Sequence, residues 1–161
     1  MTVKEYNKTA DLFSDNVYRF ILKNIKNVEK AEDIVQDTYE KLWKKHSDVD
    51  FEKAKSYLFT SAYRTMIDII RREKKQGHWD EVAETQLAHQ RQYSDLGEIL
   101  LQALDRLSEI QKSVIMLRDY EGYDYEEIGD ITGLSMSQVK VYIFRGRKKL
   151  KDYLVKMDLV I

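Results

Sequence analysis

The sequence predicts an all-α protein with two small helical domains joined by a linker, and three observations support this fold. The chain of 161 residues contains no proline, although about 5% of the residues of an average protein are proline. Apolar residues recur at helical spacing before residue 76 and again after residue 95. No cysteine is present, which excludes disulfide bonds, thiolate metal sites and cysteine nucleophiles.

Three segments before residue 76 each place apolar side chains along one helical face. The first contains Val17, Phe20 and Ile25, the second runs from Ala31 to Trp43, and the third begins near Glu52. A loop from His46 to Asp50 separates the second segment from the third. We expect residues 1–75 to form one helical domain.

The helical pattern stops at residues 76–95 and then returns. This stretch contains four acids, one base and no sustained apolar face, so we interpret it as a linker. Helical periodicity resumes at Leu96, and we expect residues 96–161 to form a second domain. A single continuous bundle is the alternative.

The second domain contains the pattern of a helix-turn-helix over residues 125–144. Gly129 is the small residue needed where the two helices approach each other. Gly133 supplies the positive φ of the turn, and Leu134 is the apolar residue beneath it. Ser135 is the predicted N-cap of the second helix, and Val139 begins its buried stripe.

The other side of this second helix is predicted to bind DNA. Residues 140–151 hold six basic residues and no acid, whereas residues 119–130 hold six acids and no base, a polarity that the net charge of −1 conceals. Polar groups and cations contact base edges and phosphates, and an exposed Phe can pack on a thymine methyl. The alternative is a solvated basic helix. The predicted reading residues are Ser137, Gln138, Lys140, Val141, Phe144, Arg145 and Lys148.

Two further charged faces lie in the first domain. The third helix carries Arg64, Arg71, Arg72, Lys74 and Lys75, preceded by Tyr57, Phe59 and Tyr63. Cations beside aromatic rings suit a single strand whose bases stack, but such aromatics can equally belong to the core. The second helix presents Asp33, Gln36, Asp37 and Glu40, which form either a partner surface or a solvated face.

Three segments, in this order, resemble bacterial RNA polymerase sigma factors of the compact extracytoplasmic-function group. Residues 31–43 (AEDIVQDTYEKLW) resemble the family's polymerase-binding helix. Residues 57–72 (YLFTSAYRTMIDIIRR) resemble its −10 element segment. Residues 104–150, with Glu121-Gly122 and Val139-Lys140, resemble its −35 binding domain.

The resemblance implies a transcription initiation factor that binds core RNA polymerase and promoter DNA and helps to open the duplex. Asp33, Gln36, Asp37 and Glu40 would dock on the clamp of the largest polymerase subunit. Residues 46–55 would capture a flipped −10 base. The implied −10 residues are His46, Ser47, Asp48, Tyr57, Arg64, Arg71, Arg72 and Lys75. The family also suggests an inhibitory anti-sigma factor. It usually carries Gly-Thr where this chain has Ser137-Gln138, so the promoter sequence of relatives does not transfer.

Other functions and locations are less consistent with the sequence. A dimeric helix-turn-helix regulator acting without polymerase is the main alternative, and a helical interaction protein is another. No Walker-type loop, G-x-S-x-G elbow or H-E-x-x-H motif is present, so we expect no enzyme, cofactor or metal. No run of about 18 apolar residues and no export signal is visible, which predicts a cytoplasmic protein without membrane insertion.

Overall fold

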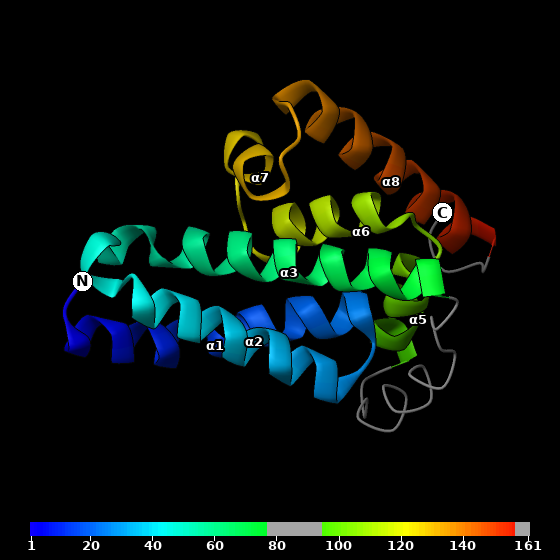
Figure 1. Cartoon of the computed structure of the whole chain (residues 1–161). Coiled ribbons are helices and arrows are strands. Elements are labelled where there is room, and N and C mark those ends of the chain that lie inside the picture. Colours follow the sequence, from blue (N-terminus) through cyan, green and yellow to red (C-terminus); the bar gives the residue numbers. More distant parts are fainter. Residues whose placement is uncertain (77–94, 157–161) are drawn as a thin grey trace. The chain divides into compact units, whose positions relative to one another are not determined.

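The computed structural model describes residues 1–76 and 95–156, and every regular element in these ranges is a helix (Figure 1). The chain divides into two compact units between His89 and Gln90. Two helical units confirm the predicted fold class. The predicted linker, residues 76–95, lies outside the described residues except for its two end residues.

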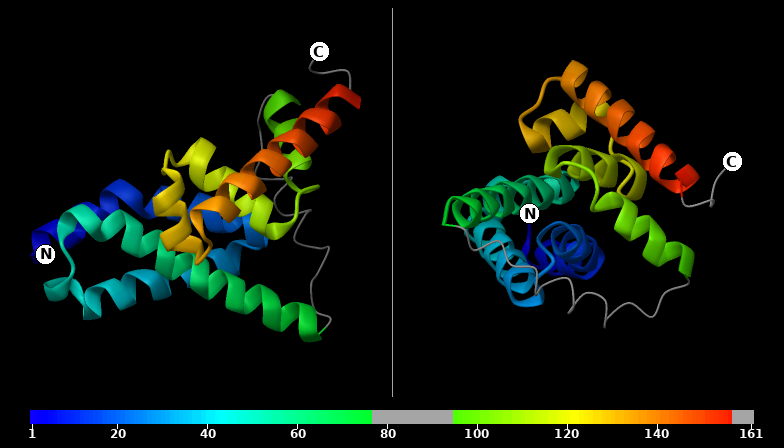
Figure 2. Two further views of the ribbon diagram at one scale, coloured as in Figure 1. Left: turned by 90° about the horizontal axis from the view of Figure 1, so that it is seen from above. Right: turned by 90° about the vertical axis from the view of Figure 1, so that its right-hand side faces the viewer.

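The first unit is a bundle of three long helices that pack against one another: α1 (Val3–Ile25), α2 (Val28–Lys44) and α3 (Ala54–Gln76). Figure 2 shows them in two further views. Two single turns of 3-10 helix, η1 (His46–Asp48) and η2 (Phe51–Lys53), join α2 to α3. The predicted loop at residues 46–50 is therefore partly helical.

Local signals explain where the first helices begin and end. Thr2 and Glu5 form a reciprocal capping box, a T-x-x-E pattern that marks the start of a helix. Lys26 ends α1 in the left-handed conformation, with φ 56°, and the side chain of Asn27 then caps α2 by accepting from the amide of Lys30. These caps allow α1 and α2 to turn within two residues.

The core of the first unit contains two aromatic side chains that the sequence also offered as stacking platforms for bases. Phe59 is fully buried and packs on Phe20 with ring centroids 5.5 Å apart. Tyr63 is also buried. The interpretation of Phe59 and Tyr63 as exposed platforms is therefore wrong, because both side chains are buried in the core of the unit.

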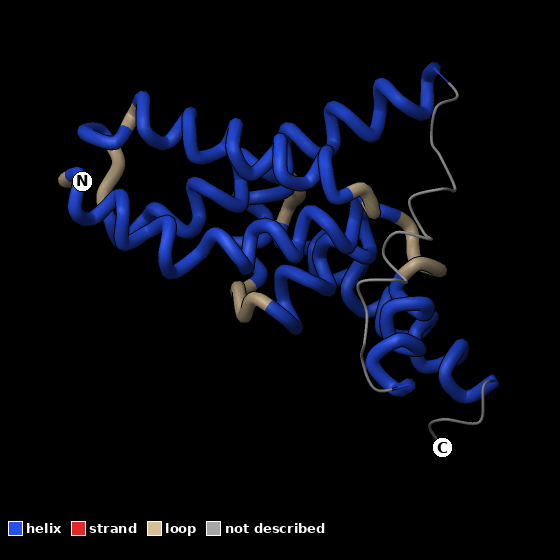
Figure 3. Tube along the Cα trace, turned by 90° about the horizontal axis from the view of Figure 1, so that it is seen from below, coloured by secondary structure: helices blue, strands red, loops and turns tan. Residues whose placement is uncertain are grey.

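Within residues 95–156, the second unit contains five helical elements: α5 (Asp95–Leu104), α6 (Glu109–Ile115), η3 (Met116–Tyr120), α7 (Tyr125–Thr132) and α8 (Met136–Lys156). Leu104, Leu107 and Ile115 form one cluster of its core, against which Leu101 and Leu150 pack. Ser108 and Gln111 form the capping box that starts α6. The element η3 is a π-helical turn, which periodicity did not predict. Figure 3 shows the short connections between these helices.

None of the helices in the described ranges is long and apolar enough to cross a membrane. Over the same ranges, no three His, Asp or Glu side chains lie where they could hold one metal ion.

Candidate nucleic-acid interface

The corner between α7 and α8 has the geometry of a helix-turn-helix. Gly133 ends α7 with φ 81°, a conformation that suits glycine. A Cβ built on Gly129 would lie 2.8 Å from the carbonyl oxygen of Leu134, so the backbone of α7 touches the turn directly. Ser135 accepts from the amide of Gln138 at 3.1 Å and caps α8. The sequence predicted the roles of all three residues.

The two sides of α8 differ sharply. Val139, Ile143 and Gly146 are buried against the rest of the unit. The seven predicted reading residues are all exposed, and Phe144 is 70% exposed. Six of them form two rows at helical spacing. One row holds Lys140, Phe144 and Lys148, and the other holds Ser137, Val141 and Arg145.

Gln138 also has a local structural role. Its side-chain oxygen accepts a hydrogen bond from the amide of Ser135 at 2.9 Å, which completes the capping box of α8. Its carboxamide oxygen is therefore engaged at the first turn of the helix, so Gln138 helps to fix where the predicted reading helix begins.

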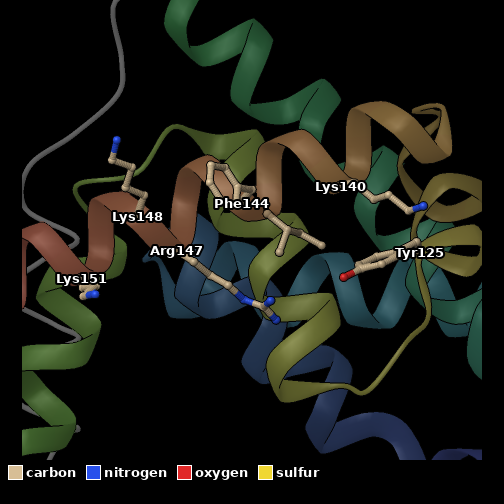
Figure 4. Close-up of a pocket in the computed structure, with 7 residues that line it drawn as sticks. Tyr125, Lys140, Phe144, Arg147, Lys148 and Lys151 are labelled. Carbon is tan, nitrogen blue, oxygen red and sulfur yellow. The ribbon is translucent and has the colours of Figure 1, made fainter.

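A groove of about 580 Å³ runs beside the row that contains Phe144 (Figure 4). Ile143 forms part of its lining. The polar and aromatic lining residues are Tyr125 from α7 and Lys140, Phe144, Arg147, Lys148 and Lys151 from α8. This lining contains four cations and no carboxylate, which makes the groove suitable for an anion.

Tyr125 organises the cations at one end of the groove. Arg118 lies 4.8 Å and Lys140 lies 5.7 Å from the centroid of the Tyr125 ring, distances at which a cation is attracted to an aromatic face. Arg118 also donates to the carbonyl oxygen of Tyr123 at 2.9 Å. The ring therefore links η3, α7 and α8.

Arg147 is held by a carboxylate from a different element. Its Nε and Nη2 donate to the two carboxylate oxygens of Asp119 at 3.3 and 2.5 Å. This hydrogen bonding raises the pKa of the Arg147 guanidinium. The ion pair joins the acidic segment, residues 119–130, to the basic segment, residues 140–151. The charge pattern of the sequence showed that these segments have opposite charge but not that they are in contact.

Five of the eight predicted −10 residues lie on α3 and are spread along its length. Arg64, Arg71, Arg72 and Lys75 are exposed, and Tyr57 is half-buried near the start of the helix. Tyr57 and Lys75 are eighteen positions apart, which corresponds to about 27 Å along a helix. The structure therefore arranges these residues as an extended track and not as one cluster.

An aromatic cluster supports the connection before α3. The imidazole of His46 stacks on the indole of Trp43 at 4.5 Å, and Tyr6 meets the same indole edge-on at 5.0 Å. His46 Nδ1 lies 2.6 Å from the Trp43 carbonyl oxygen. Ser47 and Asp48 follow on η1 and are exposed.

The acidic residues of α2 share one face. Asp33, Gln36 and Glu40 are exposed and Asp37 is half-buried. Asp37 pairs with Lys41 at 3.0 Å, and Glu40 pairs with Lys44 at 3.3 Å. These i,i+4 pairs are solvent-exposed and therefore weak, so a cationic partner could replace the lysines at little cost.

Comparison with known proteins identifies the family to which both units belong. Residues 11–76 match the family model described as Sigma-70 region 2, and residues 97–150 match the one described as Sigma-70, region 4. RNA polymerase sigma factor SigV of Bacillus subtilis (strain 168) is 33% identical over 143 residues, covering 88% of this chain and 86% of SigV. The chain belongs to the sigma-70 family. It is a sigma factor of the extracytoplasmic-function group, and such a factor directs RNA polymerase to promoters.

Further relatives and solved structures agree with this assignment. ECF RNA polymerase sigma factor SigM of Bacillus subtilis (strain 168) is 28% identical over 159 residues, covering 94% of each chain. The sigma factor RpoE from Bartonella quintana, solved in complex with the anti-sigma factor NepR, matches with a TM-score of 0.76 and 26% identity, covering 94% of this chain and 98% of that one. CnrH, solved with the cytosolic domain of CnrY, has a TM-score of 0.70 at 22% identity and supports the fold.

Sequence reasoning did not single out three residues at the interface of this sigma factor. Tyr125 and Arg147 line the groove, and Asp119 holds Arg147. The basic run from residue 140 to residue 151 included Arg147, but nothing in that run distinguishes it from its neighbours. The π-helical turn η3, which positions Asp119, has no signal in the apolar pattern.

Proposed function

We propose that this sigma factor reads a −35 element with the exposed rows of α8, contacts the −10 region through α3 and the preceding turns, and docks on core RNA polymerase through α2. In this assignment residues 1–75 form the polymerase-binding and −10 domain, and residues 96–161 form the −35 domain. The observation that carries the proposal is the helix-turn-helix corner, which buries one side of α8 and leaves its cationic side exposed.

The chemistry of α8 suits the major groove of DNA. A major groove admits an α-helix, and side chains there read base edges. Arg145 can donate two hydrogen bonds to guanine, Ser137 can bond to several bases, and Phe144 can pack on a thymine methyl. Lys140 and Lys148 flank Phe144 by one turn on each side and can hold phosphates of the backbone.

The first unit supports two different contacts. The exposed cations of α3 suit a DNA backbone, and the turns at residues 46–53 lie next to the first turn of that helix. The acidic face of α2 instead repels DNA and attracts a basic protein surface. We therefore assign Asp33, Gln36, Asp37 and Glu40 to the clamp of the largest polymerase subunit.

Linking the two DNA-binding units makes weak contacts effective. The chain has a net charge of −1, so the protein as a whole has no general electrostatic attraction to DNA. Once the protein is docked on polymerase, binding of one element raises the effective concentration of the other unit at its own element. Promoter recognition is therefore expected from the holoenzyme and not from the free chain.

Three further properties belong to the same proposal. The chain acts by binding and orienting polymerase, without catalysis of its own. It works in the cytoplasm, where bacterial polymerase meets DNA. An anti-sigma factor restrains it, as NepR is bound to RpoE in the similar structure, and the exposed faces of α2 and α8 would be the surfaces to cover.

Run-off transcription tests the proposal directly. Bacterial core polymerase, the full chain and a genomic template library are combined, and the 5′ ends of the transcripts are mapped. We expect initiation at defined sites with the chain and none with core polymerase alone. A dimeric chain that binds a palindromic operator tightly without polymerase, and that initiates nothing, would establish the alternative regulator.

A further inference from the structure

The groove beside α8 is lined on one side by the row that holds Lys140, Phe144 and Lys148, and its further lining residues Tyr125, Arg147 and Lys151 lie outside both rows. Its cations are not equally available. Lys148 and Lys151 have no carboxylate within 4.0 Å among the residues that the structure describes. Arg147 is different, because Asp119 engages both its Nε and its Nη2. The Arg147 guanidinium, which is the strongest anion-binding group of the groove, is therefore already bound by a carboxylate of the same chain.

We propose that this groove holds a backbone phosphate of DNA, beside the bases that α8 reads, and that Asp119 occupies Arg147 until the phosphate replaces it. The inference rests on the proposed function, since it requires α8 to lie on DNA. It adds a binding site and makes Asp119 an internal competitor of DNA.

The position of the groove favours a DNA strand as its occupant. In helix-turn-helix proteins the second helix enters the major groove while the first helix crosses the backbone. The groove runs along α8, which supplies four cations, and reaches α7 at Tyr125 in the first turn of that helix (Figure 4). The Tyr125 hydroxyl points into the groove, where it could donate to a phosphate oxygen.

The chemistry of the ion pair allows the exchange. The guanidinium fork that accepts a carboxylate in two hydrogen bonds accepts a phosphate in the same way. The side chains of Arg147 and Asp119 are 47% and 41% exposed, and an ion pair so open to solvent is easily replaced. Asp119 lies on η3 and Arg147 lies on α8, so the exchange does not require α8 to unwind.

The competition has a measurable signature in the salt dependence of DNA binding. Each cation that neutralises a phosphate steepens the slope of log affinity against log salt by about 0.9. In the wild type, Arg147 adds little net to this slope, because the Asp119 carboxylate that the phosphate displaces stays beside the DNA and offsets the charge of Arg147. Asn at position 119 should free that charge. The slope should then steepen by about 0.9, which corresponds to about 3.5-fold greater loss of affinity between about 50 and 200 mM salt.

The experiment compares four forms of the full chain by fluorescence anisotropy on a labelled duplex of random sequence. We expect Asp119→Asn to bind more tightly at low salt and with the steeper slope. Arg147→Gln should change the slope little, and the double variant should lose the gain. Both the double variant and Asp119→Asn lack the ion pair, so any loosening of the fold affects both proteins equally. They differ only in that Asp119→Asn retains Arg147 with its charge free to bind DNA.

Asp130→Asn is the matched control, because it removes an exposed acid of α7 that no ion pair of this groove uses. The proposal is overturned if Asp119→Asn equals Asp130→Asn, if it weakens binding, or if no form binds the duplex at low salt. Titrating the full chain with inorganic phosphate at constant ionic strength tests whether a small anion, and not DNA, occupies the groove. Phosphate binding that saturates below ~1 mM would overturn the assignment to DNA. The proposed function is tested separately by run-off initiation, so the two can fail independently.

Discussion

Gly146 of α8 packs its backbone directly against the Cδ1 atom of Ile115 in α6. A Cβ built on Gly146 would overlap that methyl group, and it would also lie 3.4 Å from Ile115 Cγ1 and 3.5 Å from Gln111 Cβ. Ile115 is itself only 2% exposed, so it has little room to move. This close approach fixes how α8 is seated on the core and therefore which of its sides is left exposed.

Replacing Gly146 by Ala is expected to destabilise the second unit by about 1 kcal/mol. The added methyl overpacks the contact, which costs about 1–3 kcal/mol, while the better helix propensity of Ala returns about 1 kcal/mol. Hydrogen exchange of the full chain measures the effect, with the amides of α8 as the reporter and those of α3 as the internal reference.

The variant Ile115→Val provides the control for this contact, since it removes the Cδ1 atom that the methyl group added by Gly146→Ala would meet. Alone it should cost about 0.5–1.5 kcal/mol. The double variant should be about 1 kcal/mol more stable than the sum of the two single effects. Strict additivity would show that the Gly146–Ile115 contact is not the cause.

Arg145→Ala is expected to weaken −35 recognition and leave polymerase binding unchanged. A lost contact to a base edge costs about 1–3 kcal/mol, and the side chain is exposed, so the fold should not change. Competition among promoter duplexes measures recognition by the holoenzyme, and core binding is measured in parallel. Lys156→Ala removes an equal charge at the end of α8 and should have a smaller, sequence-independent effect. An equal loss of both activities would contradict the division of roles between the units.

Phe144 is expected to recognise the 5-methyl group of a thymine in the −35 element. Once run-off mapping has defined a promoter, each −35 thymine is replaced by deoxyuridine, which lacks only that methyl. At least one replacement should weaken wild-type holoenzyme by about 0.8 kcal/mol, the contribution of one buried methyl group. The Phe144→Ala holoenzyme should not respond to the same replacement. Val141, which is 44% exposed in the neighbouring row, is the contact to examine if the Phe144→Ala protein still responds.

Asp37→Lys should have the opposite profile to Arg145→Ala. It reverses a charge in the middle of the acidic face of α2 and releases Lys41 from its pair. Against a basic partner surface, like charges cost several kcal/mol, so core polymerase binding should fall about tenfold or more. The holoenzyme that still forms should discriminate among −35 sequences as the wild type does. Asp11→Lys makes the same charge change at an exposed position of α1. If Asp11→Lys loses as much core polymerase binding as Asp37→Lys, the loss comes from the change in net charge and not from a contact made by α2.

The apolar pattern was sufficient to predict the α-helices of the second unit, and single residues were sufficient to predict the turn between α7 and α8, because these features have local causes. Gly133 needs a positive φ, and Ser135 caps the next helix through its own side chain. Whether an aromatic side chain of α3 lies in the core or on the surface was harder to predict. Phe59 and Tyr63 sit only five and one positions before Arg64, yet they point into the core, because a rotation of about 100° per residue separates neighbours on a helix.

Non-local pairs were beyond the reach of the sequence. Asp119 and Arg147 are 28 residues apart, and they meet because the π-helical turn η3 carries the carboxylate toward α8. Lys30 and Glu73 similarly tie the start of α2 to the end of α3. Charge runs indicate that attraction is possible, but only packing decides which acid meets which base. The groove beside α8 depends on the same packing, so it could not be predicted from the sequence.

Asp124 should make the stability of the second unit depend on pH in the acid range. Its carboxylate caps α7 by accepting from the amide of Glu127 at 2.8 Å, and this backbone hydrogen bond lowers the pKa of Asp124 below its ordinary value of 3.8. A lowered pKa in the folded state means that the stabilisation is complete above that ordinary value and is lost as the pH falls through the folded-state value. Asp124→Asn keeps a capping acceptor that does not titrate. Thermal unfolding of both proteins between about pH 5 and pH 2 should therefore show the wild type losing stability relative to Asp124→Asn. Parallel curves over this range would mean that the ionised cap does not stabilise α7.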